Sequence, residues 1–311
     1  MLNRFDKIFL IDINPGNDEI TKEIVMGRLS RIVKNASIYQ NIVIVSHSNL
    51  VLLKKLVSDI GIKIGFIISD NGARVYSITE DRIIFESVIK PEDVLAATHF
   101  AIMEGSLVLA SGSAREYAYS VNLLNALALN KKHYVPLPYT NDYGKFSKFI
   151  ISTNIHSILV FQKERKNMLA VNERFSVVVN DWDLNTSAGQ ATYFIVNSRR
   201  TSKYNAVVKV MENVKISNID KIFYYAVNTI DSKCVRAFKN RLIYQDIAFK
   251  SEFIDNISVQ ANIDGIVTNM QKAFFTGDDG TISSKFTTKE ILDINKLHTI
   301  MREVRNTKKI A

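Results

Sequence analysis

Polar residues stand at the ends of three short apolar segments in the first quarter of the chain. Asp12 lies in KIFLIDI, Ser46 ends NIVIVS, and Asn71 follows GFIISD. A carboxylate, a hydroxyl and an amide combine hydrogen-bond donors and acceptors, so together they suit a polar ligand. If the segments are parallel strands, their carboxyl ends meet at one edge of a sheet, where ligands bind in open α/β folds. We therefore expect Asp12, Ser46 and Asn71 to converge on one crevice.

The segments that position these residues alternate between strand and helix patterns. Three apolar runs are too short for helices and are predicted to be buried strands, at residues 7–13, 41–46 and 65–69. Apolar residues recur at helical spacing over 18–35 and 50–60, and Gly61 would end the second helix. A β-hairpin is predicted at 74–78 and 82–86. Continuous apolar strands that alternate with helices indicate an α/β fold with a doubly wound, Rossmann-like parallel sheet.

The middle of the chain has the size and the mixed pattern of an inserted α/β domain. Its predicted helices are at residues 91–130, with a strand-like piece at 106–113, and at 163–172. Its predicted strands are at residues 148–151, 157–162, 176–180 and 192–197. The doubly wound pattern then resumes with helices at 203–213, 231–239 and 263–275 and a strand at 221–227. We predict a core of residues 1–78 and 198–275, an inserted domain of 79–197 and a basic extension of 276–311.

The composition excludes several classes of protein. Of 311 residues, 47% are apolar and 23% are charged, which excludes a chain whose main state is disordered. The apolar runs fall far short of the about 20 residues that cross a bilayer, so we expect no membrane span and a cytoplasmic location. A single cysteine, Cys234, excludes a disulfide framework and a cysteine-rich metal site. The net charge of +9 indicates either an anionic partner or charge spread over solvated surfaces.

Several segments resemble motifs of the haloacid dehalogenase-like hydrolase superfamily, in order and spacing over residues 5–275. FIISDNGARVY at residues 66–76 is similar to the family's strand, Asn-Gly-Ala turn and hairpin strand. KIFLIDIN resembles the nucleophile strand, IVIVSHS the second motif, and Thr201-Ser202-Lys203 the lysine motif. IFYYAVNTIDSKCV resembles the acidic fourth motif, and NIDGIVTNMQKAFF the last helix. Within the superfamily the chain looks like the Cof-type sugar-phosphate phosphatases, so the resemblance implies that residues 79–197 form a large α/β cap.

The resemblance implies phosphoryl transfer through an aspartyl-phosphate on Asp12. Ser46 and Asn71 would bind the phosphoryl group, and Lys203 would neutralise charge on the nucleophile and the phosphate. The ligands of a Mg²⁺ ion would be Asp12, the backbone carbonyl of Asn14, and Asp231. The implied substrate is a small phosphorylated metabolite that the cap would select.

Three departures from the family pattern fall on groups that carry chemistry. Asn14 stands at the position of the catalytic general acid, and loss of such an acid costs about 10²–10⁴-fold in rate. Val227 replaces the first acid of the fourth motif, so only Asp231 remains of the pair. His47 and Ser48 replace the Gly-Arg of the second motif. We therefore predict a protein of phosphatase ancestry with weakened or lost activity, which binds a ligand or a partner and needs no cofactor.

Two alternatives remain open at this point. In the first, the protein is an active Mg²⁺-dependent phosphatase, and His47 is either an acid that substitutes for Asn14 or a solvated loop residue. In the second, the basic surface and tail bind nucleic acid or another macromolecule, which predicts a steep loss of affinity with salt. A stretch of aromatic and basic residues from Tyr134 to Lys148 lines a substrate mouth, stacks on nucleic-acid bases, or forms a cap surface or loop that its aromatic residues anchor.

Overall fold

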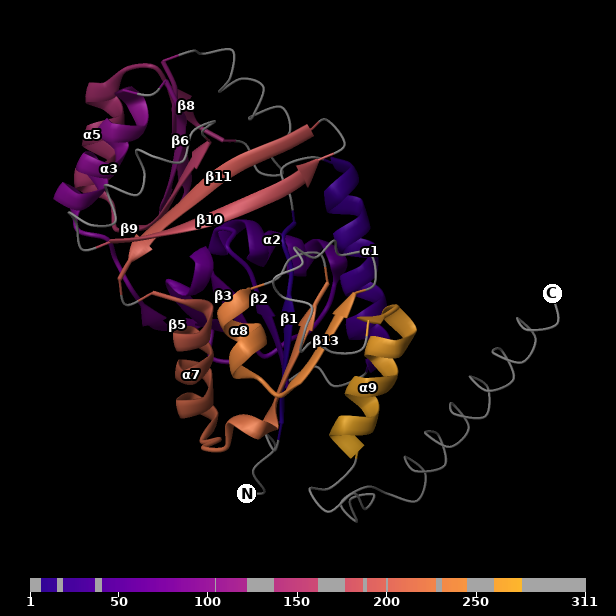
Figure 1. Ribbon diagram of the computed structural model, residues 1–311. Helices are drawn as coiled ribbons and strands as arrows, with labels where there is room; N and C mark the ends of the chain where they lie inside the picture. The colour runs from indigo at the N-terminus through magenta and orange to yellow at the C-terminus, as the bar shows by residue number, and fades with distance from the viewer. Residues whose placement is uncertain are drawn as a thin grey trace.

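The computed structural model of the chain describes residues 7–15, 19–36, 41–103, 105–121, 137–161, 177–186, 189–199, 201–227, 231–244 and 260–275. Within these ranges the strands form one sheet of eight strands and another of six (Figure 1). The strands of the second sheet all come from the part of the chain between two strands of the first. The predicted α/β fold, a doubly wound parallel core with an inserted α/β cap, is confirmed.

The first sheet contains the three apolar runs that precede Asp12, Ser46 and Asn71. Its order is β14-β13-β12-β1-β2-β3-β4-β5. The bounds are β1 Ile8–Asp12, β2 Ile42–Val45, β3 Phe66–Ser69, β4 Arg74–Ser77, β5 Arg82–Glu86, β12 Ile222–Ala226, β13 Asn240–Tyr244 and β14 Gln260–Ala261. The six strands from β14 to β3 are parallel, and β3, β4 and β5 are antiparallel. Every residue of β1, β2 and β3 is buried, because helices cover both faces of the sheet.

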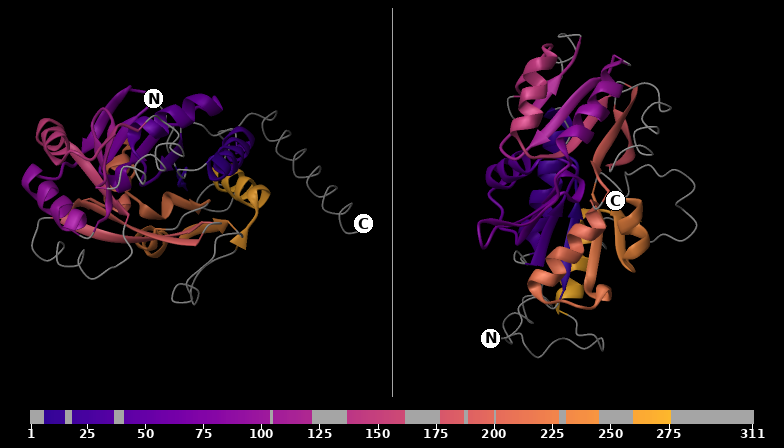
Figure 2. Two further views of the ribbon diagram at one scale, coloured as in Figure 1. Left: turned by 90° about the horizontal axis from the view of Figure 1, so that it is seen from above. Right: turned by 90° about the vertical axis from the view of Figure 1, so that its left-hand side faces the viewer.

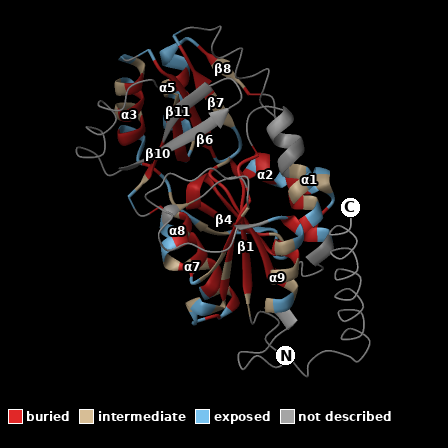
Figure 3. Cartoon of the chain, turned by 45° about the vertical axis from the view of Figure 1, so that its right-hand side comes forward, coloured by how far each residue is buried: buried red, intermediate tan, exposed pale blue. Residues whose placement is uncertain are grey.

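The helices of the core pack against the two sides of β1. Its side chains alternate in direction, so Phe9 and Ile11 face one side of the sheet and Ile8 and Leu10 the other. On the first side lie α1 (Glu19–Ala36), α2 (Leu50–Ile60) and α9 (Ile263–Phe275), and on the second lie α7 (Lys203–Val214) and α8 (Ser232–Ala237). Gly61 ends α2 in the left-handed conformation at φ 65°, as predicted. Figure 3 shows the buried strands between these helices. None of the described helices is long and apolar enough to cross a membrane.

The second sheet and its helices form the cap, which lies over one end of the first sheet (Figures 1 and 2). Its order is β10-β11-β9-β6-β7-β8. The bounds are β6 Leu107–Gly112, β7 Glu116–Tyr119, β8 Tyr139–Thr140, β9 Ile155–Phe161, β10 Val177–Thr186 and β11 Gly189–Ser198. Helices α3 (Pro91–Met103) and α5 (Tyr143–Ser152) pack on one face, where Phe146 and Ile150 meet Val108 and Ile158. Strand β5 pairs within the first sheet although it lies beyond residue 78, and the predicted boundaries at 78 and 198 stay predictions.

Two secondary-structure predictions in the cap are wrong. Residues 148–151 are part of α5 and not a strand, because Asp142 starts a helix by accepting a hydrogen bond from the Lys145 backbone nitrogen at 3.2 Å. Of the described residues between 91 and 121, those of α3 are helical and β6 confirms the predicted strand-like piece at 106–113, but β7 stands where helix was predicted. The predicted helix at 163–172, residues 122–130 and the extension 276–311 lie outside the described residues.

Candidate functional site

The carboxylate of Asp12 is enclosed at the end of β1 and has a hydrogen-bond donor on each oxygen. The Lys203 Nζ lies 2.6 Å from Oδ1, and the Tyr224 hydroxyl donates to Oδ2 at 2.7 Å. The side chains of Asp12 and Lys203 have no exposure to solvent. Because a buried charge is costly unless it is paired and hydrogen-bonded, these two donors are what makes the burial of this carboxylate tolerable.

Lys203 reaches Asp12 because α7 begins directly beside the turn that follows β3. The Ser202 side chain starts the helix by accepting a hydrogen bond from the Asn205 backbone nitrogen at 3.0 Å. Gly72, in the turn Asp70–Gly72, lies against this helix start with a φ of 96°. A Cβ atom at Gly72 would stand 2.3 Å from the Ser202 carbonyl oxygen, so only glycine permits this approach.

Tyr224 reaches Asp12 from the neighbouring strand. Strands β12 and β1 are parallel and in a register that places Tyr224 opposite Leu10, on the side of the sheet that Asp12 also faces. The tyrosine hydroxyl also accepts a hydrogen bond from the Asp231 backbone nitrogen at 3.0 Å. The phenol is therefore held from two sides, as donor to Asp12 and acceptor from Asp231. The sequence analysis did not identify this residue.

Ser46 and Asn71 lie beside each other, as expected for residues at neighbouring strand ends. The Asn71 backbone nitrogen donates to the Ser46 carbonyl at 3.2 Å, and the Ser46 hydroxyl accepts from the Ser48 backbone nitrogen at 3.0 Å. Asn71 is in the left-handed region at φ 58°, and its side chain donates to the Asn197 side chain on β11 of the cap at 3.1 Å. Asn71 thus contacts the cap directly, and its predicted role in phosphate binding stays a prediction.

The residues around Asp12 do not fit the Mg²⁺ ion that the resemblance implies. Both Asp12 oxygens accept hydrogen bonds from an ammonium group and a phenol, and Val227 is a fully buried apolar residue at the end of β12. The Asp231 carboxylate accepts a hydrogen bond from the Cys234 backbone nitrogen at 2.8 Å and so starts α8. Within the described ranges no three His, Cys, Asp or Glu side chains form a group that could hold a metal. Since Mg²⁺ prefers octahedral oxygen ligands, the buried Asn14 cannot complete such a site alone.

Burial shifts the pKa values of two groups in the crevice. Burial raises the pKa of the Asp12 carboxyl to about 6, although the charge of Lys203 and the hydrogen bonds from Lys203 and Tyr224 act in the opposite direction. Burial, assisted by the charge of Lys203, lowers the pKa of His47 to about 3. His47 is therefore uncharged near neutral pH, which argues against its use as a proton donor. The interpretation of His47 as a solvated loop residue is wrong, because its side chain is buried.

A second buried ion pair lies within the core and is hydrogen-bonded to the cap. The Arg74 Nε donates to Asp70 Oδ2 at 2.8 Å, and neither side chain is exposed. The Ser111 hydroxyl at the end of β6 donates to the other Asp70 oxygen, and Asn49 donates in turn to Ser111. Arg74 also donates to the carbonyl of Ser113 at 3.0 Å. The turn after β6 is thus held by charged groups of the core.

Replacement of Tyr224 by phenylalanine tests the enclosure of Asp12. Tyr224→Phe is expected to lower the free energy of unfolding by about 1–3 kcal/mol, because Asp12 Oδ2 and the Asp231 nitrogen both lose a partner. The loss should be larger at pH 8 than at pH 5, since the variant lacks a hydrogen bond that favours the charged carboxylate. Urea denaturation followed by circular dichroism at pH 5 and pH 8 measures the loss and its dependence on pH. Tyr225→Phe is the control, because its hydroxyl bonds Asn269 on the opposite face of the sheet; equal losses in the two variants would contradict the assignment.

Comparisons with known proteins agree with this fold. A sugar phosphatase of haloacid dehalogenase subclass IIB has a TM-score of 0.63 at 14% identity, over 85% of this chain and 98% of its own. A phosphatase of the same superfamily from Bacteroides thetaiotaomicron has a TM-score of 0.64 at 12% identity, over 86% of this chain and 94% of its own. A haloacid dehalogenase-like hydrolase from B. subtilis has a TM-score of 0.62 at 15% identity, over 85% of this chain and 99% of its own.

Sequence comparisons give a separate result. A search among curated proteins found no significant match. The sequence profile of the haloacid dehalogenase-like hydrolases, in contrast, matches residues 31–223. This match spans more than half of the chain and includes the turn at Asn71, the whole cap and the start of α7. The chain belongs to the haloacid dehalogenase-like hydrolase family.

Proposed function

We propose that this protein is a member of the Cof-type phosphatase group whose phosphatase activity is weakened or lost, and whose crevice and cap serve to bind a ligand or a partner. The observation that carries the proposal is the enclosure of Asp12. Both oxygens of Asp12 accept hydrogen bonds from buried donors, which hold the carboxylate in place and reduce the electron density that it can offer to a phosphorus atom. Asn14 at the general-acid position and Val227 at the metal position support the same conclusion.

A second candidate, an active phosphatase, is favoured by a different observation. Asp12 and Lys203 lie in contact, and Ser46 and Asn71 stand at the ends of the two adjacent strand segments. This is where the family resemblance places the nucleophile, the neutralising lysine and the phosphate-binding groups. For this candidate Asp12 must attack while its oxygens are hydrogen-bonded to Lys203 and Tyr224, and a Mg²⁺ ion must find ligands that the described residues do not offer.

A phosphatase assay separates the two candidates. Wild type and Asp12→Asn are assayed with an aryl phosphate and a panel of sugar phosphates, with and without Mg²⁺. The proposal expects Mg²⁺-dependent turnover that is absent or about 10²–10⁴-fold below the about 1–10³ s⁻¹ that is typical of enzymes, since the loss of the general acid alone costs this factor. Circular dichroism of both proteins shows whether Asp12→Asn is folded. Mg²⁺-dependent turnover at an ordinary enzyme rate of about 1–10³ s⁻¹ that disappears in a folded Asp12→Asn would overturn the proposal and favour the active phosphatase.

Two further expectations are unchanged by the structure. The cytoplasmic location remains a prediction. The binding of a protein or nucleic acid by the basic extension also remains a prediction, because residues 276–311 lie outside the described part of the chain.

A further inference from the structure

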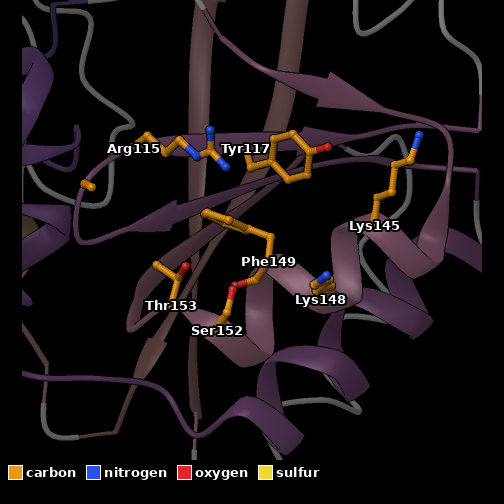
Figure 4. A pocket seen from close by; sticks show the side chains of 8 residues that line it. Arg115, Tyr117, Lys145, Lys148, Phe149, Ser152 and Thr153 are labelled. Atoms are coloured by element: carbon orange, nitrogen blue, oxygen red, sulfur yellow. The ribbon is translucent and has the colours of Figure 1, made fainter.

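We propose that a basic pocket on the cap, separate from the Asp12 crevice, binds a small phosphorylated anion. The pocket lies between helix α5 and the turn that joins β6 to β7 and has a volume of about 280 Å³. Figure 4 shows Arg115 approaching it from the turn and Lys145 and Lys148 from the helix. Of the described residues that line it, none is acidic.

The spacing of residues on α5 directs both lysines and two pocket-lining residues to the same side. Lys145, Lys148, Phe149 and Ser152 follow one another at intervals of three, one and three residues, which places them on one face of an α-helix. Both lysines are exposed, while the Phe149 ring, which lies on the Arg115 side of them in Figure 4, is buried in the cap. The helix therefore presents two ammonium groups above an apolar base.

Arg115 is positioned by contacts on both sides of the turn. Its guanidinium lies 5.7 Å from the centre of the Tyr117 ring and 5.6 Å from the centre of the Phe149 ring. Its carbonyl accepts a hydrogen bond from the Gly112 backbone nitrogen at 2.9 Å. Gly112 is needed here, because a Cβ atom would stand 2.6 Å from the Thr153 methyl group at the end of α5. The arginine is thus held in place before any ligand arrives, which lowers the entropic cost of binding.

The positive charge of this pocket is only weakly compensated by the protein. Among the described residues Lys145 has one ion-pair partner, Asp142, with a nitrogen–oxygen distance of 3.9 Å; the lysine side chain is largely exposed and the aspartate side chain about half exposed. Such an exposed pair stabilises little and yields readily to a ligand. Among the described residues no carboxylate forms an ion pair with Arg115 or Lys148. Three cations within one small concavity repel one another unless an anion is present.

Size and donor types define the class of ligand. The volume lies just below the about 300 Å³ at which pockets for drug-sized molecules begin, so the occupant is small. A planar guanidinium and two ammonium groups match the oxygens of phosphate groups, and the hydroxyls of Ser152 and Thr153 add further donors. A ligand with two adjacent phosphates, or a sugar phosphate with two negative charges, carries enough oxygen acceptors to hydrogen-bond with these donors.

Calorimetric titration tests the proposal, with inorganic pyrophosphate as the first probe and a hexose monophosphate as the second. The full chain is used in the presence of EDTA, so that neither probe binds as a metal complex. We expect saturable binding at or below about 1 mM that weakens with added NaCl. Arg115→Gln and Lys148→Gln should each lower the affinity for the more tightly bound probe by about tenfold, because each removes a charged hydrogen-bond donor. Lys148→Arg, which keeps the charge, should restore most of the affinity.

Lys63→Gln is the matched control, since Lys63 is another exposed lysine and lies between α2 and β3, away from the pocket. It should bind both probes like wild type. The relative affinities of the two probes distinguish a diphosphate ligand from a phosphate monoester. Absence of saturable binding of both probes, or equal weakening by Lys63→Gln and Lys148→Gln, would overturn the proposal. So would binding of a single-stranded oligonucleotide alone, because it would indicate a nucleic-acid surface in place of a pocket.

Discussion

Lys203→Met is expected to lower the free energy of unfolding by about 3–5 kcal/mol near neutral pH, because it leaves the Asp12 carboxylate buried without its counter-charge. The two side chains are fully buried and 2.6 Å apart, so water cannot replace the ammonium group. Urea denaturation followed by circular dichroism at pH 7.5 measures the loss. Lys209→Met, on the exposed side of the same helix, is the control and should change stability little, since its pair with Glu212 is solvated.

The loss caused by Lys203→Met should depend on pH in a defined direction. Burial raises the pKa of Asp12 from 3.8 to about 6, so the native state binds this proton more tightly than the unfolded state does. The stabilisation from this proton is complete below about 3.8 and disappears as the pH rises through about 6. A neutral carboxyl needs no counter-charge, and hence the loss should be smaller at pH 5 than at pH 8.

A double variant separates the effect of charge from the effect of packing. Asp12→Asn combined with Lys203→Met removes both charges and should recover a large part of the stability that Lys203→Met alone loses. A double variant as unstable as Lys203→Met would show that the lysine acts through packing, and the interpretation of Asp12 and Lys203 as an ion pair that persists without catalysis would fail.

The strands around Asp12 could be predicted because their signals are local. The runs that contain Ile11, Val43 and Ile67 are apolar at every position, as strands covered on both faces must be, and the polar residue at each end marks the edge of the sheet. Gly61 ended the preceding helix as expected. The convergence of Ser46 and Asn71 follows from this topology alone, without any knowledge of side-chain contacts.

Other features could not be predicted because they depend on contacts between distant parts of the chain. Tyr224 bonds Asp12 across 212 residues, and only the register of β12 against β1 decides which of the two adjacent tyrosines faces the carboxylate. The alternation of side chains along a strand is the one signal that would have found it. Residues 148–151 combine lysine with bulky apolar side chains, which suit a strand or a helix equally. Here the helix is favoured because Asp142 caps its start and because Phe146 packs against Tyr117.

Arg74→Met is the second change with a large expected effect, again about 3–5 kcal/mol in the free energy of unfolding, because Asp70 would be left as a buried, unpaired carboxylate. The same variant removes the donor to the Ser113 carbonyl, which tethers the β6–β7 turn to the core. Hydrogen exchange of the turn at residues 112–115 should therefore accelerate more than exchange in α3, because within the described residues Arg74 donates to Asp70 and Ser113 and not to α3. Urea denaturation and hydrogen exchange measured by mass spectrometry provide the two readouts.

Arg82→Met is the matched control for Arg74→Met, because Arg82 lies on the adjacent strand β5 and pairs with Glu80 at the exposed surface. It should leave both stability and exchange in the turn nearly unchanged. A second variant, Asp70→Asn with Arg74→Met, removes both charges and should recover stability while the turn still exchanges fast, since the Ser113 carbonyl remains without its donor. If exchange in the turn were unchanged in every variant, Arg74 would stabilise the core alone. The turn that carries Arg115 would then keep its position through Gly112 and the aromatic rings, without a contribution from Arg74.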